Sequence, residues 1–206
     1  MNNSPPCTNG VYIPPQCQPT GRYHGQCREL WHNYPNLNRG ESEQIIHDLG
    51  LPLVVVYLGD SFYAHVADCV AARNATRSCL VYYWTPDSFH SMFPMDKVAL
   101  PSYTSACWSG FDVNLAGSAG TSLKCGWPPE ALHKIGNTEA LKSNAILREF
   151  VANVKLGDGE LKQMMGDVDP NNATTVAVAA CKWVREHRES FWHAWIPQPP
   201  PGYRTP

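Results

Sequence analysis

The chain of 206 residues has little basic charge and no long apolar run. Its formal net charge of −2 and its pI of about 6.4 supply no positive field, which argues against nucleic acid as a partner. The longest apolar stretch, Leu51 to Leu58, is far shorter than the ~20 residues of a membrane-spanning helix. We therefore expect no part of this chain to cross a membrane.

Metal-binding spacings, phosphate-binding loops and a leader peptide are also missing. No cysteine lies in a C-x-x-C pair, and no histidine has zinc-finger spacing to one. The glycines of 117–120 match neither nucleotide-binding motif. We therefore predict no metal site and no cofactor. Residues 1–4 lack the basic start and apolar core of a signal peptide.

Cysteines, by contrast, are abundant: there are eight, at positions without metal spacing. Such cysteines indicate disulfides and an oxidising compartment. Glycosylation sequons at Asn2, Asn74 and Asn172 agree, and we predict glycans on Asn74 and Asn172. With no leader, the simplest interpretation is a fragment of a longer secreted or membrane-tethered protein.

Two disulfides are predicted from the positions of the cysteines relative to the expected helices and strands. Cys69–Cys79 and Cys107–Cys125 each bracket a loop or turn between elements, at separations that suit short bridges. Among the remaining cysteines, Cys7–Cys17 is the nearest pairing. The partners of Cys27 and Cys181 stay open.

Hydrophobic periodicity predicts alternating helices and strands in the first half of the chain. A helix is expected at 41–49, a buried strand at 53–58, a helix from 61 to about 74 and a strand at 80–83. This order is typical of a parallel α/β sheet. A further short strand is expected at 97–100 and three helices after residue 137, whereas the prolines of 1–40 and of the tail predict loops.

The most distinctive stretch is the aromatic strand end at Leu80 to Trp84. Pro86 stops this strand, so Trp84 is expected where the strand meets a loop, the edge at which α/β sheets bind ligands. Tyr83 and Trp84 precede a single acid, Asp87, and aromatic faces beside a carboxylate suit an organic cation. The alternative is that Trp84 only fills the core.

An enzyme remains the weaker alternative for the same stretch. His90 lies near Asp87, and Ser88 or Ser91 could act as a nucleophile. No G-x-S-x-G motif surrounds either serine, and such groupings arise easily by chance. We therefore predict a protein that is not an enzyme.

Three segments resemble one family, the substrate-binding proteins for glycine betaine, choline and proline betaine that serve ABC transporters. The first is the strand ending in Trp84-Thr85-Pro86, and the second is Val98 to Tyr103. The third joins the helix at 180–187 to the tryptophan-rich stretch at 191–197. The likeness spans roughly residues 25 to 197.

The resemblance implies a type II periplasmic-binding-protein-like α/β fold, present as the second lobe plus the C-terminal part of the first. On this view residues 1–40 are disulfide-pinned loops, 41–100 the second lobe, 101–197 the mainly helical part of the first lobe and 198–206 a tail. The opening of the first lobe is expected to be missing. Exposed apolar edges would then make the chain alone aggregation-prone or oligomeric.

The resemblance also implies an aromatic cage that holds a small quaternary ammonium ligand. Trp84 matches one cage wall, while Tyr12 and Trp31 are candidates for another, or else cover an edge of the core. The expected partners are this ligand and a membrane transporter or a receptor segment of the same protein. The expected location is extracellular or on the cell surface, and a ligand-sensing receptor ectodomain is the alternative to a transport protein.

Overall fold

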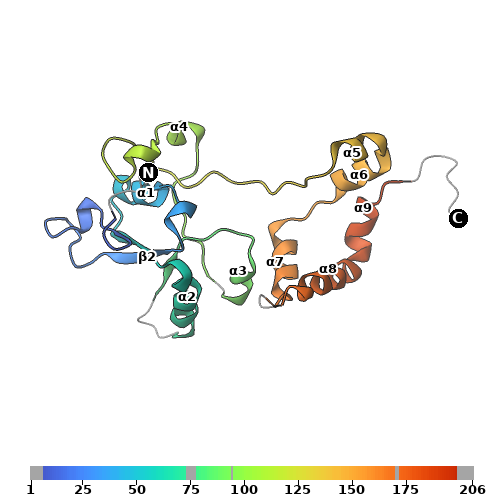
Figure 1. Cartoon of the computed structure of the whole chain (residues 1–206), viewed down its shortest axis with the longest axis horizontal. Helices are drawn as coiled ribbons and strands as arrows, with labels where there is room; N and C mark the ends of the chain where they lie inside the picture. Colours follow the sequence, from blue (N-terminus) through green and yellow to red (C-terminus); the bar gives the residue numbers. More distant parts are fainter. Residues whose placement is uncertain (1–6, 73–77, 94, 170–171, 199–206) are drawn as a thin grey trace. The chain divides into compact units, whose positions relative to one another are not determined.

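The computed structural model describes residues 7–72, 78–93, 95–169 and 172–198 (Figure 1). The chain forms two compact units. The sheet unit contains Met1–Tyr83 and Asp96–Glu130, and the helical unit contains Trp84–Met95 and Ala131–Pro206. Residues 96–130 thus belong to the sheet unit and residues 84–95 to the helical unit.

The sheet unit is built on a four-stranded sheet in the order β1-β3-β2-β4. Its strands are β1 (Val11–Tyr12), β2 (Arg28–His32), β3 (Leu53–Tyr57) and β4 (Leu80–Val81). β2 pairs in parallel with both β3 and β4, whereas β1 pairs antiparallel to β3. The parallel α/β arrangement confirms the predicted fold class, with an added antiparallel edge strand.

Several details of the sheet differ from the sequence prediction: β1 and β2 lie in the region 1–40, and β4 ends at Val81 where residue 83 was predicted. The central strand β2 lies in the region expected to be loops, because its five residues lack the run of branched side chains that marked β3. Residues 97–100, predicted as a strand, form none. Pro101 follows directly, and its ring nitrogen has no hydrogen to donate to a neighbouring strand.

Two helices cover opposite faces of the sheet (Figure 1). Ile46 of α1 (Glu41–Asp48) forms a core cluster with Tyr12 and Val55. On the other face, His65 of α2 (Phe62–Ala71) meets the ring of Trp31, with the ring centroids 6.2 Å apart. Trp31 pairs with Val56, the residue after Val55 in β3. Because successive side chains of a strand point to opposite faces, Val55 and Trp31 lie on opposite faces of the sheet.

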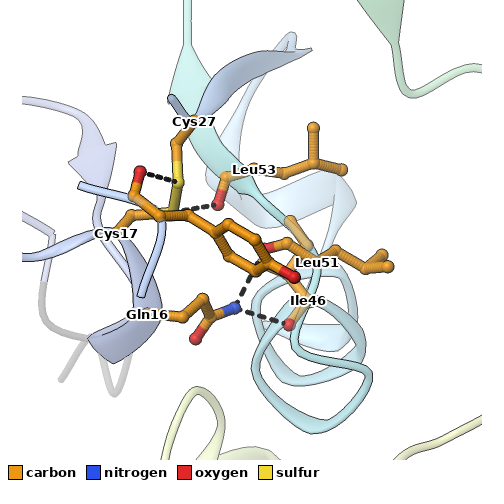
Figure 2. Close-up of a disulfide and its surroundings, with 7 residues drawn as sticks. Gln16, Cys17, Cys27, Ile46, Leu51 and Leu53 are labelled. Carbon is orange, nitrogen blue, oxygen red and sulfur yellow. Dashed lines mark hydrogen bonds between the residues drawn. A yellow bond between two sulfur atoms is a disulfide. The ribbon is translucent and has the colours of Figure 1, made fainter. Parts of the chain in front are cut away.

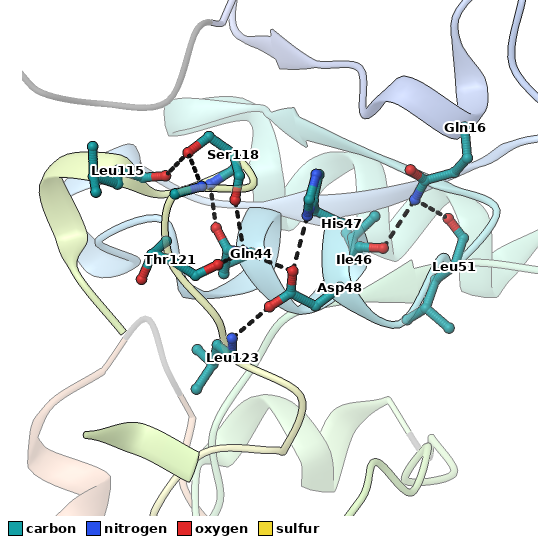
Figure 3. Close-up of polar contacts among 12 residues, drawn as sticks. Gln16, Gln44, Ile46, His47, Asp48, Leu51, Leu115, Ser118, Thr121 and Leu123 are labelled. Carbon is teal, nitrogen blue, oxygen red and sulfur yellow. Dashed lines mark hydrogen bonds and ion pairs between the residues drawn. The ribbon is translucent and has the colours of Figure 1, made fainter. Parts of the chain in front are cut away.

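The glycine- and serine-rich segment after α4 (Ser105–Trp108) is fastened to α1 by hydrogen bonds (Figure 3). Gln44 Nε2 donates to the carbonyls of Ser118 and Thr121, both at 3.1 Å, and Gln44 Oε1 accepts from Gly117 N at 2.7 Å. Asp48 Oδ2 accepts from Leu123 N at 2.5 Å. These bonds order a segment that has too few apolar residues to pack by itself.

Three disulfides cross-link the sheet unit. Cys69–Cys79 and Cys107–Cys125 form as predicted. The suggested Cys7–Cys17 pairing is wrong: Cys17 bonds to Cys27, and Cys7 and Cys181 are free thiols. Next to this bridge, Gln16 Nε2 donates to the carbonyls of Ile46 and Leu51 at 2.9 and 3.0 Å, which ties the N-terminal loop to the end of α1 (Figure 2).

The helical unit consists of short helices joined by loops. They are α3 (Ser88–Met92), α5 (Thr138–Ser143), α6 (Ala145–Asn153), α7 (Asp158–Gly166), α8 (Thr174–Glu186), a π-helical turn (Arg188–Trp192) and α9 (His193–Trp195). The single helix predicted for 138–154 is divided at Asn144, whose side chain caps α6 by accepting from Leu147 N. Trp183 packs against Phe191 and Trp195, which joins α8 to the chain's last helix.

Several predicted features lie at or beyond the limits of the described chain. Asn74, Asn2 and most of the tail are outside the described residues, so only Asn172 can be placed. Asn172 is exposed, and its Oδ1 accepts from Thr174 N at 3.1 Å. Within the described ranges, no helix is long and apolar enough to span a bilayer.

Candidate functional site

The carboxyl ends of β2, β3 and β4 meet at one edge of the sheet because the three strands run in the same direction. The loops that leave this edge are joined to one another. Gly59 N donates to the carbonyl of Asn33 at 2.8 Å, and the Tyr34 hydroxyl donates to the Asp60 carboxylate. This edge is where the sequence placed the ligand site, at the end of β4.

One face of this edge carries a group of aromatic rings at the start of α2. The ring of Tyr83 stacks on that of Phe62, with the centroids 6.0 Å apart. The hydroxyls of Tyr83 and Tyr63 lie 3.2 Å apart, and the Tyr63 side chain is 48% exposed. Tyr63 was missed by the sequence reasoning, although it follows β3 at the same edge at which Tyr83 follows β4.

The other face carries a buried stack below the same edge. His32, at the end of β2, lies parallel to Tyr82 with the ring centroids 4.5 Å apart, and Tyr82 meets Trp127 at 5.0 Å. His32 is 1% exposed, and desolvation lowers its pKa to about 3. It is therefore neutral at pH 7, and its ring packs in the core against Tyr82.

A buried carboxyl group lies deeper on that face. Glu43 of α1 is fully buried and accepts hydrogen bonds from Asn38 Nδ2, at 2.7 Å, and from the Tyr57 hydroxyl. Burial raises the pKa of Glu43 above its ordinary value. The hydrogen bonds lower this pKa, but their effect is smaller than that of burial. This network holds α1 to β3.

Trp84 is not part of the core. Its side chain is 47% exposed, which rules out the alternative that it only fills the interior. It follows Tyr83 and precedes the Thr85–Pro86 bond, which is cis; β4 itself ends at Val81, earlier than the predicted end at residue 83. Trp84 thus lies, partly exposed, a few residues beyond the carboxyl end of a parallel strand.

Asp87 follows three residues later and begins α3. Its Oδ1 accepts from Phe89 N at 2.8 Å, so it is the N-cap of this helix. Asp87 also lines a cavity of about 200 Å³ within the helical unit. The other lining residues are Thr85, Pro86, His90, Asp158, Gly159 and Lys162.

The two remaining candidates, Tyr12 and Trp31, lie on opposite faces of the sheet. Tyr12 is 2% exposed, and its hydroxyl donates to the carbonyl of Gly117 at 3.1 Å, so its ring is a core contact with no face left for a ligand. Trp31 is half-buried beside α2, and its Nε1 donates to Glu29 Oε2 at 2.7 Å. The structure does not bring these two rings together.

The arrangement of α3 does not favour the hydrolase alternative. Ser88 and His90 are two residues apart on one helical turn, and side chains at this spacing do not face each other. The carboxylate of Asp87 serves the helix end. The side chain of Ser91 lies outside the described part of the chain.

Comparison with known proteins identifies the family. A family model described as the substrate binding domain of the ABC-type glycine betaine transport system matches residues 33–186, about three quarters of the chain. No curated protein and no solved structure matches significantly. The matched range contains β3, β4, Trp84 and the helices through α8, the same elements that carry the aromatic edge and the cavity. The chain therefore belongs to the family of substrate-binding domains of ABC-type glycine betaine transport systems, with its type II periplasmic-binding-protein fold.

Proposed function

We propose that this chain binds a small quaternary ammonium compound of the glycine betaine or choline type, outside the cell, for ABC-type transport. The observation that carries the proposal is the exposed indole of Trp84 at the end of β4, next to Tyr83 and three residues before Asp87. A quaternary ammonium has no N–H to donate, so it is recognised by aromatic faces and by negative charge. Trp84 and Asp87 offer both.

The location rests on the disulfides of the sheet unit. Three cross-links in one small unit persist only in an oxidising compartment, which supports secretion or display at the cell surface. The family supports transport as the purpose of binding. A substrate-binding domain needs no catalytic group, which agrees with the arrangement of α3.

Affinity requires several contacts to act together. A cation over one aromatic face gains ~0.5–2 kcal/mol, whereas micromolar binding needs about −8 kcal/mol. Further aromatic faces are therefore needed together with that of Trp84. Each wall that is lost should weaken binding by roughly tenfold, because ~1.4 kcal/mol corresponds to one decade.

Calorimetric titration of the full chain with choline and with glycine betaine tests this proposal. Trp84→Ala should weaken binding about tenfold or more, and Trp84→Phe should retain part of it because a smaller aromatic face remains. Tyr103→Ala is the control, since Tyr103 is a comparably exposed aromatic (39%) that packs next to Trp108 and is not among the proposed contacts. Failure of the wild-type chain to bind either compound would contradict the proposal, and full binding by Trp84→Ala would remove Trp84 from the site.

A further inference from the structure

The glycosylation sequon at Asn172 lies directly at the start of α8. Asn172 and Thr174 are both exposed, and Thr174 is the first residue of the helix. Ala173 between them satisfies the sequon, which excludes only proline at this position. The acceptor asparagine and the hydroxyl residue of this sequon are therefore both open to a large modifying group.

The side chain of Asn172 is oriented through its oxygen. Asn172 Oδ1 accepts from Thr174 N at 3.1 Å and from the Thr174 hydroxyl at 2.7 Å. The Asn172 carbonyl accepts from Thr175 N at 3.0 Å, which fixes the backbone of the same turn. Such turns form within a few residues of the chain, so this one does not depend on distant partners.

Two exposed side chains follow Thr174 along α8. Val178 is four residues after Thr174, and Cys181 is three residues after Val178, so the three lie on one face of the helix. We call them the outward face of α8, because the buried residues of the helix, Ala179 and Trp183, lie on the other side. Val178 is 65% exposed, and Cys181 is an exposed free thiol. An exposed thiol in an oxidising compartment is open to disulfide exchange with other proteins.

A glycan on Asn172 would begin next to this face. Both hydrogen bonds to the Asn172 side chain come from Thr174, the first residue of the outward face. With the rise per residue of an α-helix, Cys181 lies only ~10 Å from Thr174 along the helix axis. N-linked glycans are bulky and hydrophilic, so one attached here restricts the approach of other macromolecules to this face.

We propose that Asn172 carries an N-linked glycan, which covers the outward face of α8 and shields the Cys181 thiol from other macromolecules. This inference rests on the extracellular location in the proposed function and not on the ligand. In the attachment, Asn172 Nδ2 forms a bond to the anomeric carbon of an oligosaccharide carried on a lipid diphosphate. The bond from that carbon to the diphosphate breaks, the lipid diphosphate leaves, and one amide proton is released to solvent.

Secretion of the full chain from a eukaryotic host tests the attachment. Enzymatic release of glycans in heavy-oxygen water converts each glycosylated asparagine to a labelled aspartate, and peptide mapping then locates the label. We expect the label at Asn172. Thr174→Val should lose it, because this change removes the sequon hydroxyl, whereas the matched control Thr174→Ser should keep it.

Cys181 itself reports whether the glycan covers the face. A maleimide attached to a large polyethylene glycol should label the peptide that contains Cys181 slowly in the glycosylated chain. Its rate should rise severalfold after release of the glycan and in Thr174→Val. Iodoacetamide, a small reagent, should label Cys181 at similar rates in all of these proteins, which shows that the thiol itself is unchanged.

The results also separate this inference from the proposed function. An unlabelled Asn172 in a secreted chain with closed disulfides would exclude the glycan and leave the extracellular location in place. A glycan on Asn172 with equal polymer labelling before and after its release would show that the outward face is not covered. A chain that is not secreted with closed disulfides would contradict the location itself, and this inference with it. Failure to bind choline or glycine betaine would contradict the ligand alone.

Discussion

The sheet unit and the helical unit hold their structure in different ways. The sheet unit contains all three disulfides of the described chain and a core of fully buried side chains such as Phe62, Ile45 and Leu123. The helical unit buries few large side chains, chiefly Phe89 and Trp183. Both units expose large apolar side chains, such as Leu132 and Ile135 in the helical unit and Ile13 and Val98 in the sheet unit, so the difference lies in what is buried.

This contrast suggests that the sheet unit provides most of the stability, whereas the helical unit contains the cavity. Burial of apolar area is the main favourable term in folding, so the sheet unit should carry most of the free energy of unfolding. The cavity and Asp158 lie in the helical unit, where fewer side chains are buried. Elements that bind ligands are commonly drawn from the less stable parts of a protein, because such parts can adjust when a ligand enters.

The sharpest test of the contrast compares two phenylalanines. Phe62→Ala in α2 should cost about 3–5 kcal/mol, because Phe62 is fully buried and stacked on Tyr83. Phe150→Ala in α6 should cost about 1 kcal/mol or less, since Phe150 is 38% exposed. Urea unfolding with hydrogen exchange read separately in α2 and α6 measures both. Equal losses would show that the helical unit is as well packed as the sheet unit.

The disulfides provide the second test. The double variant Cys107→Ser with Cys125→Ser should lose about 3 kcal/mol, because the bridge closes a loop of 18 residues. Cys181→Ser, at an exposed free thiol of the helical unit, should leave the urea midpoint unchanged. A loss below about 1 kcal/mol in the double variant would mean that the hydrogen bonds from Gln44 and Asp48 suffice to hold the loop.

The smallest expected effect is a pH dependence that belongs to the sheet unit. His32 has its pKa lowered by desolvation to about 3, whereas an unfolded histidine titrates near 6.5, so the unfolded chain binds the extra proton first as the pH falls. Stability should therefore drop by roughly 2 kcal/mol between pH 6.5 and pH 5 from this group alone. Glu43 acts in the opposite sense, because burial raises its pKa in the folded chain. Its contribution to the free energy of unfolding is present at low pH and is lost as the pH rises through this raised pKa.

The variant His32→Phe isolates the histidine, because Glu43 is present in both proteins. Urea midpoints at pH 6.5 and pH 5 should fall less in His32→Phe than in the wild-type chain. His133→Phe, at an exposed histidine of the helical unit, should keep the wild-type dependence. Parallel pH profiles for the wild type and His32→Phe would contradict the buried, neutral histidine.

Local patterns were enough to predict some of the fold and of the site. The branched run of β3 and the aromatic run ending in β4 were recognisable because a strand buried on both faces needs apolar residues throughout. Pro86 predicted an end of this strand near Trp84, because its nitrogen has no hydrogen to donate to a neighbouring strand, and β4 ends at Val81. Cys69–Cys79 and Cys107–Cys125 were predictable because each closes a short loop between such elements.

Other features depend on contacts between distant parts of the chain. Cys7–Cys17 and Cys17–Cys27 would close loops of equal length, so the entropy of loop closure cannot choose between them. β2 is a strand because it has a partner on each side, although its own residues favour that state only weakly. The cavity joins Asp87 to Asp158 and Lys162, more than 70 residues later, and no local pattern relates them.

The sequence alone thus determined the fold class, the family likeness, two cross-links and the existence of β4, since each depends on residues that lie close together in the chain. Only the tertiary structure decided the strand β2, the third disulfide, the burial of Tyr12, the exposure of Trp84 and the cavity lined by α3 and α7. The physical reason is that pairing, burial and net local charge are properties of groups brought together by folding.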